Sequence, residues 1–107
     1  MSNNPEDLKL ATLATATMAR SASSSAAALR DKTGRTYVAI PVSSGGFEID
    51  ALLSVLVVAK ASQITGIEAI VIAGDKPDLS SQAVIASEDA TAKLFMVDSV
   101  GLLLALN

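Results

Sequence analysis

Apolar residues recur at helical spacing near the start of the chain. Asn4 can cap a helix, Pro5 fits its first turn, and the two acids that follow are favoured by the helix dipole. From residue 10 to residue 18, apolar and small residues then fall on one face. We therefore predict a helix that begins near residue 4 and ends in the serine cluster at residues 21–25.

The next segment changes to strand-like alternation on both sides of a turn. Asp31-Lys32-Thr33-Gly34 is a turn sequence in which the glycine suits a positive φ. Arg35 begins the return towards Val42. The pattern predicts a β-hairpin over residues 25–42, followed by a plain loop at residues 43–46.

Residues 51–59, within a predicted element at residues 49–64, have almost no polar face. Val55, Val57 and Val58 favour a strand, whereas the length, a cap at Asp50 or Glu48 and a stop at Gly66 favour a helix. We predict a helix. Because a helix that is apolar all round should be buried all round, a domain of this size would need a partner to cover it.

The remaining chain alternates strand and helix signals. Residues 67–73 form a continuous apolar run between two glycines, which is typical of a central parallel strand covered on both faces. Pro77 and Asp78 open a short helix that reaches about residue 87, and residues 93–98 resemble another strand. Residues 102–106 fit a strand or a short helix. The inner face of the short helix is expected to carry Leu79, Ala83, Val84 and Ala86.

This order of elements predicts an α/β fold, a three-layer α/β/α sandwich with helices on both faces of a mixed sheet that opens with the hairpin at residues 25–42. The length of 107 residues suits a single domain over residues 1–107. Because hydrophobic residues make up 50% of the chain but aromatic ones only 3%, the core must be aliphatic.

Charge and hydropathy exclude several classes of partner. A net charge of −3 gives no attraction to nucleic acid or anionic membranes. The apolar run at residues 49–59 is shorter than the roughly 20 residues that span a bilayer. The acidic start of the chain lacks the basic region of a signal peptide. We therefore expect a cytoplasmic protein with no nucleic-acid or membrane partner.

The chain contains no histidine and no cysteine. The usual tetrahedral zinc site and the commonest base and nucleophile are thereby excluded. Ser80 and Ser81 have no histidine to activate them, and residues 43–46 match no phosphate-binding fingerprint. The basic residues around the hairpin turn, Arg30, Lys32 and Arg35, are typical of a solvated loop. We expect no catalytic residue, no cofactor and no bound metal.

Several segments resemble the cytidine deaminases: Ala28-Leu29-Arg30-Asp31, Gly34-Arg35-Thr36-Tyr37, the stretch from Ala51 onward, and residues 66–73 and 77–97. Zinc deaminases place a Cys or His ligand two residues before a catalytic Glu, and a Pro-Cys-x-x-Cys motif supplies the other ligands. In the register of this resemblance, those positions are Asp50, Leu52, Asp78 and Ser81. The sugar-reading motif falls on Pro41-Val42-Ser43. The resemblance thus implies a degenerate member that lacks the zinc and catalytic motifs.

The resemblance also implies a residual cleft between the starts of two helices. Its candidate residues include two acids, each of which also fits a helix cap, and an acidic pair could instead bind a hard cation. The candidates are Ser43, Ser44, Asp50, Asp78 and Ser81.

Two classes of function follow. The first is a non-catalytic scaffold or interaction protein that forms a homo-oligomer, a dimer or tetramer, through the apolar helix at residues 49–64. The alternative is a binding protein for a small, nucleoside-like molecule, or a divergent hydrolase, that uses the residual cleft. A true cytidine deaminase is the third reading.

Overall fold

The computed structural model describes residues 4–107. Residues 1–3 of the predicted single domain, which are also the first residues of the acidic start of the chain, lie outside the described residues. Within residues 4–107, three helices and seven strands follow one another. They are α1 (Pro5–Ser21), β1 (Ser25–Asp31), β2 (Thr36–Ala39), β3 (Val42–Ser44), β4 (Phe47–Ile49), α2 (Ala51–Ala61), β5 (Ile67–Gly74), α3 (Leu79–Glu88), β6 (Lys93–Val97) and β7 (Leu103–Ala105).

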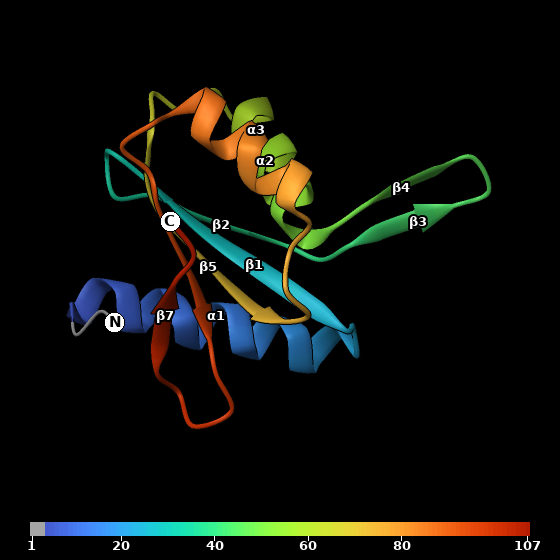
Figure 1. Cartoon of the computed structure of the whole chain (residues 1–107), viewed down its shortest axis with the longest axis horizontal. Coiled ribbons are helices and arrows are strands. Elements are labelled where there is room, and N and C mark those ends of the chain that lie inside the picture. Colours follow the sequence, from blue (N-terminus) through green and yellow to red (C-terminus); the bar gives the residue numbers. More distant parts are fainter. Residues whose placement is uncertain (1–3) are drawn as a thin grey trace.

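Five strands form one sheet in the order β2-β1-β5-β6-β7. β5 is antiparallel to β1 and parallel to β6, so the sheet is mixed. Figure 1 shows α1 on one side of this sheet and α2 and α3 on the other. The predicted three-layer α/β/α sandwich is confirmed, as is the central place of the strand at residues 67–73, which is buried on both faces.

The first helix has the predicted start. The side chain of Asn4 accepts a hydrogen bond from Glu6 N at 2.8 Å, and Pro5 occupies the first turn. The apolar stripe that contains Leu10 and Ala14 packs on Val71 and Leu103 of the sheet. One of the two core clusters therefore lies between α1 and the sheet.

The hairpin of β1 and β2 is confirmed, with Ala28 opposite Val38. Its second strand ends at Ala39 rather than at Val42. Pro41 has no N–H to donate to a ladder, and the chain leaves the sheet there. Residues 42–49 then form a second, two-stranded hairpin in place of the predicted plain loop. We call this hairpin the arm, and Figure 1 shows that it projects from the body.

The apolar segment is a helix, but α2 runs only over Ala51–Ala61, shorter than the predicted 49–64. Ile49 belongs to the arm, and Gln63 adopts a φ of 60° past the helix end, before Gly66 is reached. α2 buries Leu52 and Val55 in the second core cluster. Val57 is 59% exposed, so a single chain does not bury this helix all round.

The face of α3 was predicted wrongly. Ser81 and Ile85, one turn apart, are the buried residues, whereas the side chain of Leu79 is 77% exposed. Ala83, Val84 and Ala86 are also exposed. The start of α3 is tied to α2 by the hydrogen bond from Asp78 N to Asp50, and Ile85 packs in the core cluster with residues of α2 and the sheet.

The end of the chain is a strand, since β7 covers Leu103–Ala105 and pairs with β6. Its inward residue, Leu103, is fully buried under α1. Among residues 4–107, no helix combines the length and the hydropathy that a membrane crossing requires.

Candidate functional site

A pocket of about 570 Å³ opens where the first turns of α2 and α3 meet. Its walls are the start of β1, the base of the arm, and the segment that leads from β5 into α3. Four of the five residues chosen from the sequence line it. These are Ser43, Asp50, Asp78 and Ser81, whereas Ser44 lies further out along the arm and does not line the pocket.

Asp50 holds the two helix starts together. Its Oδ1 accepts a hydrogen bond from Leu53 N at 2.9 Å, which caps α2. Its Oδ2 accepts one from Asp78 N at 3.1 Å. The capping interpretation is thus confirmed for Asp50. Asp78 stands at the N-cap position of α3, but its side chain makes no capping hydrogen bond.

The pocket residues do not fit the zinc site of a deaminase. Both carboxylate oxygens of Asp50 already accept backbone hydrogen bonds. Asp78 and Ser81 offer only oxygen, and zinc sites of this kind need nitrogen or sulfur ligands. Within residues 4–107, no group of three or more acidic side chains is placed to hold a metal ion.

Leu52 occupies the position that the resemblance assigns to the catalytic Glu. Its side chain is fully buried in the core cluster between α2 and the sheet. An aliphatic side chain neither accepts nor donates a proton, so this position performs no acid–base step.

Two serine hydroxyls on the pocket wall are nearly buried. Ser81 is 2% exposed and Ser25 is 5% exposed as whole residues, and neither hydroxyl has a hydrogen-bond partner within residues 4–107. In that part of the chain, Arg30 Nη1 is the only unpartnered side-chain nitrogen or oxygen that is sealed from solvent. The two hydroxyls therefore reach accessible space, and the pocket is the space that they line.

Sequence reasoning found Ser81 but missed Ser25. The signal was present, because alternation along β1 places Ser25 on the same side as Ala27 and Leu29, which pack under α2. Three charged residues of the pocket rim were also missed. They are Glu48 from the arm and Asp75 and Lys76 from the segment after β5, all exposed.

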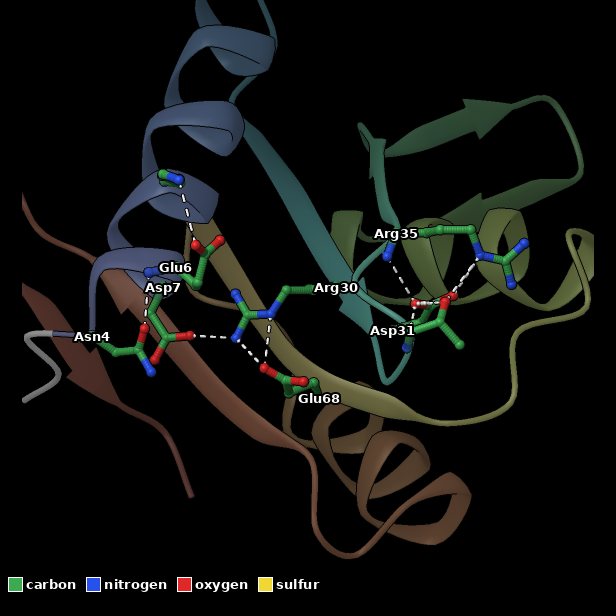
Figure 2. A network of polar contacts seen from close by, with 9 residues as sticks. Asn4, Glu6, Asp7, Arg30, Asp31, Arg35 and Glu68 are labelled. Carbon is green, nitrogen blue, oxygen red and sulfur yellow. Dashed lines mark hydrogen bonds and ion pairs between the residues drawn. The ribbon is translucent and has the colours of Figure 1, made fainter.

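The strongest ion pairs lie outside the pocket, on the α1 side of the sheet (Figure 2). Arg30 Nη2 is 2.7 Å from Asp7 Oδ1 and 2.9 Å from Glu68 Oε1. Burial lowers the pKa of Arg30, but hydrogen bonds to Asp7 and Glu68 outweigh it and leave the pKa raised. Arg30 is buried, so the interpretation as a solvated loop residue is wrong for it.

Asp31 organises the turn of the first hairpin. Its Oδ1 accepts hydrogen bonds from the amide and hydroxyl of Thr33 and from Arg35 N, and its Oδ2 accepts one from Arg35 Nε. Burial raises the pKa of Asp31, yet these hydrogen bonds dominate and leave the pKa below its ordinary value. Lys32 lies 3.4 Å from Asp89, whose pKa is also lowered, chiefly by hydrogen bonds from Thr91 and Ile67.

Comparisons with known proteins agree on the fold. The crystal structure of cytidine deaminase from Mycobacterium leprae is similar, with a TM-score of 0.69 and 15% sequence identity over 91% of this chain and 90% of that one. No curated protein matches the sequence. A family model described as cytidine deaminase-like matches residues 3–101. Since that match spans nearly the whole sequence, the chain belongs to the cytidine deaminase-like family.

Proposed function

We propose that this protein is a non-catalytic member of its family that binds a small molecule in the pocket between α2 and α3. The observation that carries the proposal is the pair of unpartnered hydroxyls, Ser25 and Ser81, on the pocket wall. Each hydroxyl reaches the pocket without a partner in the described protein, so a ligand bound there can donate a hydrogen bond to it or accept one from it. The volume of about 570 Å³ also falls within the range of small-molecule sites.

The residue types in the pocket argue against catalysis. Deamination by this family needs a zinc-bound water and a side chain that transfers protons. The chain has neither histidine nor cysteine, and Leu52 stands where the proton carrier would be. The same absence of a base argues against a hydrolase that would use Ser80 or Ser81 as its nucleophile.

A thermal-shift screen of nucleosides and small polar metabolites tests the proposal. A ligand at 100 times its dissociation constant adds about 2.7 kcal/mol to the free energy of unfolding, which raises the melting temperature measurably. Ser81→Ala should reduce the shift, because it removes one hydrogen bond to the ligand. Ser87→Ala, in the same helix but exposed and outside the pocket, should keep it.

Two results would contradict this function. A screen without any Ser81-dependent shift would remove the binding role, and conversion of cytidine to uridine by the purified protein would remove the non-catalytic one.

A second candidate function is an oligomeric scaffold or interaction protein. It is favoured by Val57 and Val58, apolar residues that α2 leaves exposed on its outer side. Covering them with a second copy would remove apolar area from water, at about 25 cal/mol per Å². A cytoplasmic location and the lack of a nucleic-acid partner stay predictions.

A further inference from the structure

We infer that the pocket takes a hydroxylated primary amine in its protonated form, the chemical class of amino sugars and amino alcohols. The inference rests on the proposed binding function and adds the chemistry of the ligand. Two features of the pocket carry it, namely the excess of hydrogen-bond acceptors on its rim and the unpartnered hydroxyls on its wall.

The rim is rich in acceptors. Four acidic residues line the pocket, Glu48, Asp50, Asp75 and Asp78, against one basic residue, Lys76. Asp50 uses both of its oxygens on backbone amides. The other three carboxylates have no hydrogen bond or ion pair to any side chain or backbone group of residues 4–107. An ionised carboxylate only accepts hydrogen bonds, so the complementary ligand is one that donates them.

The wall offers hydroxyls at greater depth. Ser25 and Ser81 are nearly buried, whereas Glu48, Asp75 and Asp78 are exposed. A serine hydroxyl both donates and accepts, which matches a ligand hydroxyl and gives no preference for charge. The arrangement therefore orients the ligand, because its hydroxyls are satisfied inside and its ammonium group is satisfied at the rim.

Charge sets the selectivity. Four carboxylates and one ammonium leave an excess of three negative charges around the pocket. A phosphorylated or carboxylated ligand would be repelled, and a protonated amine gains charge-assisted hydrogen bonds that a neutral hydroxyl in its place would lack.

Isothermal titration calorimetry with three sugars of matched size tests the inference at slightly acidic pH. The probes are glucosamine, glucose and glucose 6-phosphate, which carry a cation, no charge and an anion on similar skeletons. We expect glucosamine to bind about tenfold more tightly than glucose, from one charge-assisted contact, and glucose 6-phosphate not to bind. Added salt should reduce the difference in affinity between glucosamine and glucose, because it screens the charge of the amine.

Substitutions test the acidic rim and the serine hydroxyls of the wall separately. The double replacement Asp75→Asn with Asp78→Asn should bring the affinity for glucosamine down to that for glucose, while glucose binding stays as it was. Ser81→Ala should weaken both sugars by a similar factor. Glu6→Gln removes an exposed carboxylate of α1, outside the pocket, and should change neither. Circular dichroism of each variant confirms that it is folded.

Each possible failure has a distinct meaning. Equal affinity for glucose and glucosamine, tighter binding of glucose 6-phosphate, or no response to any of the three sugars overturns the amine class. The broader screen then decides the proposed function separately, since a Ser81-dependent neutral or anionic ligand found there would keep the binding role.

Discussion

At the scale of single residues, two adjacent charged residues at the end of β1, Arg30 and Asp31, are buried. Arg30 reaches the side that α1 covers, and Asp31 belongs to the turn of the first hairpin (Figure 2). A shift in register between these two residues interrupts the pairing with β5. The two side chains therefore stabilise different parts of the fold, and substitutions can test them independently.

Arg30→Met should lower the free energy of unfolding by about 3–5 kcal/mol, because it removes the ion pair between Arg30 and the buried carboxylate of Asp7. The double variant Arg30→Met with Asp7→Leu should recover much of that loss, since no buried charge is left behind. Urea unfolding measures the free energy of unfolding of both variants. Arg20→Met, at the exposed end of α1, serves as the control and should stay within about 0.5 kcal/mol of the parent. A double variant no more stable than the single one would contradict this account.

Asp31 should make stability depend on pH in acid. Its pKa in the folded protein lies below the ordinary value of 3.8, so its contribution is complete above that pH and is lost as the pH falls through the folded pKa. We expect Asp31→Asn to be less stable than the parent at neutral pH and to lose less stability on acidification. Because the lowered pKa of Asp89 acts in the same direction, the measured quantity is the difference between the two unfolding curves. Parallel curves from neutral pH to strong acid would show that Asp31 has no such role.

At the scale of elements, local signals predicted the starts of α1 and α2 and the first turn better than the buried face of α3. The caps at Asn4 and Asp50 and the turn at Gly34 were readable, because each depends on a few adjacent residues. The arm was also readable, since Gly45-Gly46 between two short β-prone runs is a two-residue hairpin signal. The prediction of a plain loop at residues 43–46 was wrong, because residues 42–44 and 47–49 pair across this turn.

The inward face of α3 depends on distant residues. Its apolar side chains are spread around the helix, and the side that turns inwards is the one that packs against α2 and the sheet. No local pattern in residues 79–88 contains that information.

A pair of substitutions tests the corrected face. Ile85→Ala should cost about 2–5 kcal/mol, because it opens a cavity in the core cluster that α2 shares with the sheet. Leu79→Ala should stay within about 0.5 kcal/mol of the parent, because this leucine is exposed. Guanidinium unfolding of the two variants, compared with the parent protein, measures both effects. Similar losses at the two positions would favour the face predicted from the sequence.

At the scale of the whole molecule, the sequence was informative about the layers and only partly about the pocket. The alternation of helix and strand signals sufficed for the three layers. The register of the deaminase resemblance selected Asp50, Asp78 and Ser81, which the fold places around one pocket. Ser25 and Asp75 were not predicted as pocket residues, because they lie outside the deaminase zinc motifs. The pairing of β1 with β5 brings them to the pocket.

The proposed oligomer belongs to this scale. We expect light scattering to find a dimer or tetramer at micromolar concentration, and Val57→Glu to shift it towards monomer by placing a charge in an apolar contact. Thr12→Glu, on the exposed side of α1 across the sheet, should leave the assembly unchanged. A monomeric parent protein would exclude assembly through α2.

Hydrogen exchange in the arm should reveal whether the pocket is occupied. A two-stranded hairpin is marginally stable by itself, so the amide hydrogens of residues 42–49 should exchange with deuterated water through local opening, long before those of β5. Ser43 and Glu48 belong both to the arm and to the pocket wall. Occupancy of the pocket would therefore be recorded as slower deuterium uptake in this short segment, against an unchanged background in the core.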